Sequence, residues 1–196
     1  MLYFSGDLKF IHKFESHVGK PYFPGGNSGV TLDPGLDLGQ VAFSSVEEYY
    51  ADILSPEQIE DLKRLRMKRG EEAKNLLKQA LLDKTPASTI EISRDQAVQI
   101  LPVIAESYWK RLCRRFPRLE SAPAPVQTAM LSLGYNRGTG NRHLKALEVP
   151  IEKGYWQAVG WIIYLMQQNH KLLGIRSRRK EEGRLILNKI QIVETN

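Results

Sequence analysis

Four polar residues near the start of the chain have the types that acid–base chemistry on a glycosidic bond requires. Glu15 follows an apolar segment, and Thr31, Asp33 and Asp37 lie within residues 25–40, GGNSGVTLDPGLDLGQ, which contain five glycines. Hydrolysis of such a bond uses one carboxylic acid to protonate the leaving oxygen and a second group to activate water or stabilise the cation. A partly buried Glu15 would keep its proton, since burial disfavours a carboxylate. Small polar side chains on a glycine-rich loop can position a water molecule.

The same residues also have a simpler structural explanation. Glu15 is then a solvated helix residue, and the aspartates are turn formers whose side chains bond to nearby backbone. The spacing alone favours this explanation. Other chemistries find less support, because the sequence has no GxSxG nucleophile elbow and no HExxH motif. The four histidines lack the spacing of metal ligands: His12, His17, His143 and His170. We expect neither a metal nor an organic cofactor.

Composition and charge narrow the classes of partner. The 196 residues are 42% hydrophobic, which fits one globular domain that buries a core without metal or disulfide, and Cys113 is the single cysteine. A net charge of +6 favours polyanions such as nucleic acid, lipid headgroups or an anionic cell wall. Nucleic-acid binding is the simplest interpretation of the net positive charge. The basic residues are dispersed, however, and no helix-turn-helix, zinc-finger or RNP pattern accompanies them, so we expect no nucleic-acid role.

The amino terminus and the apolar segments predict where the chain is made. The first ten residues lack the basic start and long apolar run of a secretory signal peptide. The longest apolar stretch, AVGWIIYLM, is too short to span a bilayer. We therefore expect synthesis in the cytoplasm without membrane insertion.

Most of the chain has helical periodicity, interrupted once near the start. Leu8, Ile11, Phe14 and Val18 recur at three- and four-residue steps, which predicts a helix over residues 6–19 with Glu15 in its last turn. Glycines and prolines forbid a helix from there to Gly39, and GVTLD at residues 29–33 has β character.

The remainder predicts a series of helices with defined boundaries. Ser55 with Gln58, and Ser93 with Gln96, form capping signatures, while Pro102 is expected to kink or split the helix that follows. The segment SAPAPVQTAMLSLGYN, short of charge, is expected to be the most buried helix. The predicted fold class is α+β, mainly α, with a small glycine-rich β element near the N-terminus.

Three stretches, in one order, resemble motifs of the phage-type lysozymes and of the related bacteriocin and toxin muramidases of the pesticin type. FESHVGKPY followed by SGVTLDPGLDLGQ resembles the segment with a catalytic glutamate, threonine and aspartate. LGYNRGTG at residues 133–140 resembles an F-N-x-G-x-G turn, and GIRSRRKEEGRLIL at residues 174–187 resembles a closing helix with paired arginines. Together they span nearly the whole chain.

The resemblance implies a role for each matching residue. Glu15 matches the general acid, Thr31 the threonine that holds the attacking water, and Asp37 the second carboxylate. The matches implied for substrate binding are Tyr135, Asn136, Arg178 and Arg179.

One departure from the motif concerns the second carboxylate. Asp33-Pro34 replaces part of the usual glycine run, so that Asp33 is a rival carboxylate close to Thr31, although the motif favours Asp37. Further along the chain, Arg178 precedes Glu182 by four residues, which predicts a helical ion pair.

As a whole, the resemblance implies a lysozyme-like domain of two lobes over residues 1–196, with the small lobe at roughly 20–90 and the large lobe at 1–19 plus 91–196. It implies a muramidase that cleaves the β-1,4 bond between N-acetylmuramic acid and N-acetylglucosamine of peptidoglycan in the bacterial cell wall. We expect a monomer that acts in the periplasm after release or delivery, and an immunity or inhibitor protein is a candidate partner. Two alternatives stay open: a lytic transglycosylase, which needs a single acid, and an inactive module that binds the wall.

Overall fold

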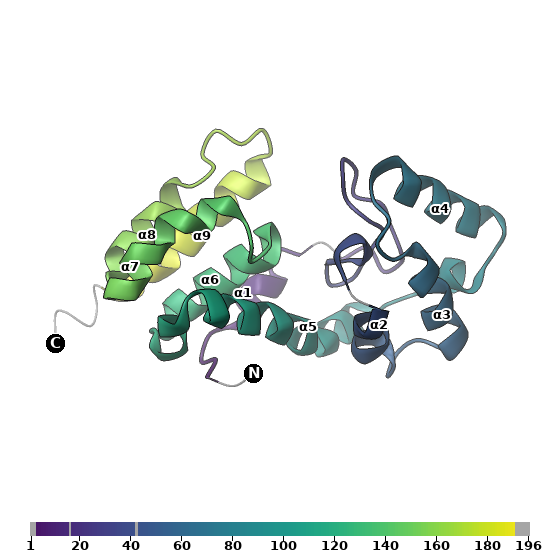
Figure 1. The fold of residues 1–196 in the computed structure, drawn as a ribbon, viewed down its shortest axis with the longest axis horizontal. Helices are drawn as coiled ribbons and strands as arrows, with labels where there is room; N and C mark the ends of the chain where they lie inside the picture. Colours follow the sequence, from purple (N-terminus) through teal and green to yellow (C-terminus); the bar gives the residue numbers. More distant parts are fainter. Residues whose placement is uncertain (1–2, 16, 42, 191–196) are drawn as a thin grey trace. The chain divides into compact units, whose positions relative to one another are not determined.

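The structure is a computed structural model that describes residues 3–15, 17–41 and 43–190 (Figure 1). The chain divides into two compact units, which are described separately. The hairpin unit comprises the described residues from 15 to 104. The helical unit comprises the described residues up to 14 and from 105 onwards.

The hairpin unit contains the predicted β element followed by helices. Two-residue strands pair antiparallel, with Thr31 opposite Asp37 and Leu32 opposite Leu36. The elements in chain order are β1 (Thr31–Leu32), β2 (Leu36–Asp37), the 3₁₀ turn η1 (Leu38–Gln40), α2 (Phe43–Tyr50), α3 (Pro56–Leu65), α4 (Gly70–Leu82), η2 (Pro86–Thr89) and the start of α5 (Arg94–Arg115).

Both predicted capping signatures in this unit are confirmed. At the start of α3 the Gln58 amide N–H donates to the Ser55 hydroxyl, and the Ser55 N–H donates to the Gln58 side chain, at 3.3 and 3.0 Å. Ser93 and Gln96 make the same reciprocal pair before α5, at 3.2 and 2.8 Å. These pairs satisfy amide groups that a helix start leaves without partners.

The first helix is shorter than its periodicity predicts. It runs only over α1 (Leu8–His12), and Ile11 is its one buried residue. Glu15 therefore lies in a bend after the helix instead of in its last turn, and Val18 is exposed. The Val18 amide N–H makes no helical hydrogen bond and donates instead to the Asp33 carboxylate, 15 residues along the chain, at 2.8 Å.

The long helix α5 continues through Pro102, so the expected split there is wrong. Pro102 lies on an exposed part of the helix. Proline has no amide N–H, so the carbonyl one turn earlier in the helix loses its hydrogen-bond donor. At this exposed position, water can bond to that carbonyl instead.

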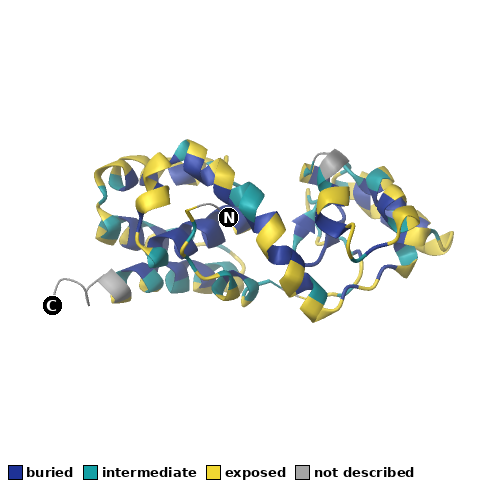
Figure 2. Ribbon diagram, turned by 90° about the horizontal axis from the view of Figure 1, so that it is seen from below, coloured by how far each residue is buried: buried dark blue, intermediate teal, exposed yellow. Residues whose placement is uncertain are grey.

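The helical unit is built around α6 (Ala124–Arg137), in which every residue from Val126 to Tyr135 is buried. This confirms the prediction of the most buried helix. In each unit the buried residues, dark blue in Figure 2, run along the helices and exposed residues form their outer sides. The other elements are η3 (Pro117–Ser121), η4 (Arg142–Leu147), α7 (Glu148–Lys153), α8 (Trp156–Leu165) and α9 (Leu173–Ile190). Among the helices of the described residues, none combines the length and apolar character that crossing a membrane requires.

Helices α8 and α9 approach each other closely because glycines face each other at their contact. A Cβ atom added at Gly183 would lie 2.6 Å from the Tyr164 Cβ and 2.7 Å from the Gly160 carbonyl oxygen. Both contacts are to atoms that cannot move without displacing the backbone of α8. Gly174, in the first turn of α9, has open space where its Cβ would be.

We expect Gly183→Ala to lower the free energy of unfolding by about 1–3 kcal/mol, because the added methyl group forces α8 and α9 apart. Gly174→Ala is the matched control in the same helix and should leave stability unchanged or raise it by up to about 1 kcal/mol. Urea denaturation of the three proteins measures both effects. Equal stability of the two variants would contradict the close approach.

Candidate active site

The hairpin places three polar side chains in one row. Tyr22 pairs with Thr31 in an antiparallel bridge, with backbone hydrogen bonds of 3.0 and 2.8 Å, and Thr31 is in turn opposite Asp37. Directly opposite residues of antiparallel strands project to the same face. Tyr22, Thr31 and Asp37 therefore line one face, whereas Leu32 and Leu36 point to the other face and are buried.

The Asp37 carboxylate binds the backbone on both sides of the hairpin. Its Oδ1 accepts hydrogen bonds from the Gly29 and Gly39 amides at 2.9 and 2.8 Å, and its Oδ2 accepts one from the Gln40 side chain at 2.7 Å. A Cβ at Gly29 would lie 2.3 Å from the Gly39 nitrogen and 2.4 Å from Asp37 Oδ1. Glycine is required at position 29 because any side chain would push these groups apart.

The Thr31 side chain is buried but only weakly held. Its hydroxyl donates to the Gly29 carbonyl at 3.5 Å, which is at the outer limit of a hydrogen bond. A hydroxyl group in such a position can turn toward a water molecule at little cost. This is the property that holding an attacking water would require.

The Tyr22 phenol is affected by the charges of three carboxylates of the hairpin unit. Its pKa is raised to about 12, first because the phenol is partly buried and then because of the negative charges of Asp33, Glu15 and Asp37. Glu15, which is half-buried, thus lies close enough to Tyr22 for its charge to act there. The hairpin unit contains all the candidate catalytic residues that the sequence predicts, and its strands place Thr31 opposite Asp37.

Asp33, the rival carboxylate, is occupied by the chain itself. It is fully buried, and its Oδ2 accepts hydrogen bonds from the Val18 and Gly19 amides at 2.8 and 2.5 Å. The His17 Nδ1 lies 3.1 Å from the same oxygen. Sequence reasoning missed this role, because the partners are 14 to 16 residues away and follow no periodic pattern.

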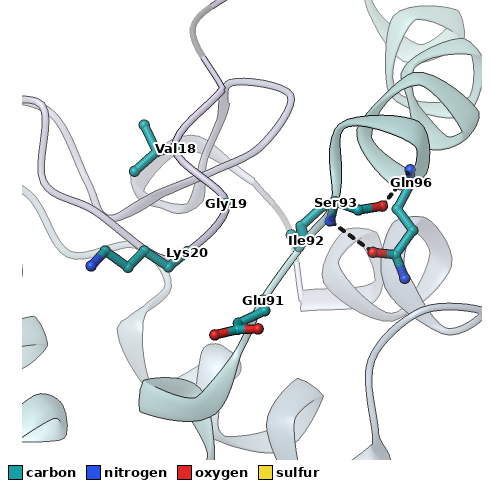
Figure 3. A pocket seen from close by; sticks show the side chains of 7 residues that line it. All are labelled: Val18, Gly19, Lys20, Glu91, Ile92, Ser93 and Gln96. Carbon is teal, nitrogen blue, oxygen red and sulfur yellow. Dashed lines mark hydrogen bonds between the residues drawn. The ribbon is translucent and has the colours of Figure 1, made fainter.

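A pocket of about 480 Å³ adjoins the segment that Asp33 holds (Figure 3). One wall consists of Val18, Gly19 and Lys20, and the other of residues 91–93 with Gln96 at the start of α5. The two walls are joined by a hydrogen bond of 2.7 Å from the Ile92 amide to the Gly19 carbonyl. Val18 and Gly19 are therefore anchored on two sides, by Asp33 and by Ile92.

In the helical unit, Glu182 binds both predicted arginines. Its fully buried Oε1 accepts hydrogen bonds from Arg179 at 2.8 Å, from Arg178 at 3.3 Å and from the Ser132 hydroxyl at 2.6 Å. The predicted pair of Arg178 with Glu182 is confirmed. Burial raises the pKa of Glu182 and lowers that of Arg179 to about 10, and the attraction of the opposite charges counters both effects.

The other two predicted substrate-binding residues lie in the last turn of α6. Asn136 is exposed, and its Oδ1 accepts a hydrogen bond from Arg179 at 3.3 Å. Tyr135 is buried and its ring lies 4.8 Å from that of Tyr108. The structure thus joins Asn136 to Arg179 and gives Tyr135 a packing contact, and their binding of substrate stays a prediction.

These features define the class of protein. The chain is mainly helical, and its one small sheet in the described residues presents a threonine and an aspartate side by side with a glutamate nearby. This is an α+β fold of the lysozyme-like type, as the sequence predicts.

Comparison with known families identifies the branch. Residues 6–156 match the family model Pesticin, described as a bacterial toxin homologue of phage lysozyme, C-terminal part. The chain belongs to this family, which confirms the resemblance drawn from its motifs. The matched range includes Glu15 and Asn136, whereas Arg178 and Arg179 lie beyond it. A comparison with curated proteins gave no match.

We expect the Tyr22 phenol to titrate near pH 12 and Tyr22→Phe to remove that titration. Because its folded-state pKa lies above that of the unfolded chain, Tyr22 contributes stability below about pH 10 that is lost as the pH rises toward 12. Asp33→Asn and Glu15→Gln should each lower this pKa, while substitution of the exposed Glu60 of α3, Glu60→Gln, should not. NMR titration of ¹³C-labelled tyrosine measures the pKa, and equal values in all variants would contradict the proximity of the acids.

Glu182→Gln should lower the free energy of unfolding by about 3–5 kcal/mol, since two buried guanidinium groups lose their counter-charge. Glu181→Gln is the control, because its partner Lys13 is exposed and such pairs contribute less than about 1 kcal/mol. Chemical denaturation at pH 7 compares the two variants. A loss below about 1 kcal/mol for Glu182→Gln would mean that the carboxyl group is neutral in the folded protein.

Proposed function

We propose that this protein hydrolyses the glycan strands of bacterial peptidoglycan, as a muramidase that cleaves the β-1,4 bond after N-acetylmuramic acid. The observation that carries the proposal is the row of Tyr22, Thr31 and Asp37 on one face of the hairpin. The charge of Glu15 is among those that raise the Tyr22 pKa, which supports a place for the glutamate near this row. Family membership supports it, since the family is described as homologous to phage lysozyme.

The carboxyl groups of Glu15 and Asp37 have different roles in the proposed reaction. Glu15 donates its proton to the glycosidic oxygen as the bond to the anomeric carbon breaks. Asp37 accepts three hydrogen bonds and donates none, which suits an ionised carboxylate that withdraws a proton from water or stabilises the oxocarbenium ion. The water oxygen bonds to the anomeric carbon, and Thr31 holds that water through its weakly engaged hydroxyl.

The stereochemical outcome depends on the distance between the carboxyl groups in the bound complex. An inverting enzyme needs about 6.5–9.5 Å to fit a water molecule, and a retaining enzyme about 5–5.5 Å. We propose the inverting course, because a threonine beside the second carboxylate has a role there as a holder of water. The net charge of +6 suits a polymer whose stem peptides carry carboxylates.

Release of reducing ends from purified sacculi, free of outer membrane, tests the proposal. Glu15→Gln should lower the rate by about 10²–10⁴-fold, since general acid catalysis is lost. Asp37→Asn and Thr31→Val should also reduce it, and Glu60→Gln is the control for removal of a glutamate from the same unit. The anomeric form of the first product, followed by NMR, separates inversion from retention.

The products also separate the alternatives. Reducing muramic ends in the native digest support hydrolysis, whereas 1,6-anhydro ends, seen by mass spectrometry, would move the assignment to a lytic transglycosylase. Binding of sacculi without release of fragments by the native protein would contradict the enzyme and leave a wall-binding module. Undiminished activity of Glu15→Gln would overturn the role of Glu15.

A further inference from the structure

Asp33 connects the hairpin to the segment that follows Glu15. Its carboxylate is at the end of β1, has no exposed surface, and binds the Val18 and Gly19 amides and the His17 ring through one oxygen. Its own backbone is fixed as well, because the Tyr50 hydroxyl of α2 donates to the Asp33 carbonyl at 2.9 Å. The carboxylate is thus a fixed point to which the segment is tied.

Burial of this charge is costly and must be offset by its contacts. A carboxylate removed from water loses its hydration, and only strong hydrogen bonds or an opposite charge compensate. Here the compensation comes from amides at Val18 and Gly19 that have no helical or strand partner. These bonds fix the path of a segment that regular secondary structure leaves undefined.

We propose that Asp33 is a positioning residue for Glu15, holding the glutamate at a set place relative to Thr31 and Asp37. The proposal rests on the proposed function, in which Glu15 is the acid. Glu15 is three residues from Val18, and the chain spans at most about 3.6 Å per residue, so the anchor is close enough along the chain for its loss to displace Glu15. Misplacement of a reacting group by about 1 Å can cost 10²-fold in rate.

Direct action of Asp33 on the substrate fits the geometry less well. Its Oδ2 already has three partners. Its Oδ1 has no hydrogen-bond partner among the described residues, but it is buried as well, so the residue presents no surface to a ligand. Asp37 in contrast is only partly buried and lies in the row with Thr31. The two aspartates of the hairpin therefore have different tasks, although the sequence presents them as rivals.

Asp61 offers a matched control within the hairpin unit. It is also a buried carboxylate, and its Oδ2 accepts a hydrogen bond from the Ala87 amide at 2.9 Å. Its bond ties α3 to η2 and involves neither Glu15 nor the row of Tyr22, Thr31 and Asp37. Asp61→Ala therefore removes a comparable anchor without a connection to the acid.

The first arm of the test measures the anchor itself by amide hydrogen exchange in NMR. Asp33→Ala should speed exchange at Val18 and Gly19 by about ten-fold or more, because these amides lose their acceptor. Asp33→Asn keeps an acceptor oxygen and should show a smaller increase in exchange rate. It replaces Asp33→Ala in this measurement if the alanine variant does not fold. Asp61→Ala should speed exchange at Ala87 and leave Val18 and Gly19 unchanged.

The second arm measures hydrolysis of sacculi. Asp33→Ala should lower kcat by about 10–100-fold while the half-saturating concentration of sacculi changes less than about three-fold, since the acid is misplaced and the substrate contacts remain. Asp33→Asn should recover part of the rate, and Asp61→Ala should stay close to the native protein.

Four outcomes would overturn the proposal. Unchanged exchange at Val18 and Gly19 in Asp33→Ala would show that no anchor exists. The Asp33→Asn variant could lose as much activity as Glu15→Gln while its amide exchange at Val18 and Gly19 stays unchanged. That result would make Asp33 a group that acts on the substrate. If the native protein is active and the Asp33→Ala and Asp61→Ala variants have equal kcat values, the positioning role of Asp33 is wrong but the proposed function stands. If the native protein is inactive, both the proposed function and the positioning role are wrong.

Discussion

The register of the hairpin is the constraint on which the candidate site depends. Because side chains alternate between the faces of a strand, a slip of one residue would put Thr31 and Asp37 on opposite faces. Strands of two residues have too few ladder bonds to prevent such a slip by themselves. The Asp37 carboxylate supplies the missing restraint, since it bonds to Gly29 on one side and Gly39 on the other.

The glycines and acids of residues 25–40 occur together for this reason. A carboxylate can join two backbone segments only where both amides come within hydrogen-bond distance of it, and at Gly29 that approach leaves no room for a Cβ. Gly35, with a φ of +98°, supplies the left-handed conformation of the turn between the strands. Turn formation and a catalytic site are therefore not competing explanations of this segment, because the same bonds that form the turn hold the polar row.

Features set by neighbouring residues could be predicted from the sequence. The capping pairs at Ser55 and Ser93, the β character around Thr31 and the ion pair of Arg178 with Glu182 all follow from spacings of a few residues. The charge-poor segment that became α6 could be predicted as well, because burial follows from composition.

Features set by distant residues could not be predicted in this way. The hydrogen bond of the Val18 amide to Asp33 joins residues 15 positions apart, and the contact of Arg179 with Asn136 joins residues 43 positions apart. Local periodicity carries no information on such partners. Motif matching named Glu15 as the acid, but periodicity placed it in a helix and not in the bend where it lies.

Asp37 has both a structural and a proposed chemical role, and its two oxygens differ in a way that permits both. Oδ1 is bound by two backbone amides, which cannot move without disrupting the hairpin. Oδ2 is bound by the amide of Gln40, an exposed side chain that can rotate away. A water molecule or a sugar hydroxyl can replace Gln40 at that oxygen while the register stays fixed. The proposed chemistry at Oδ2 is thus compatible with the restraint at Oδ1, because the two functions use different atoms of the same carboxylate.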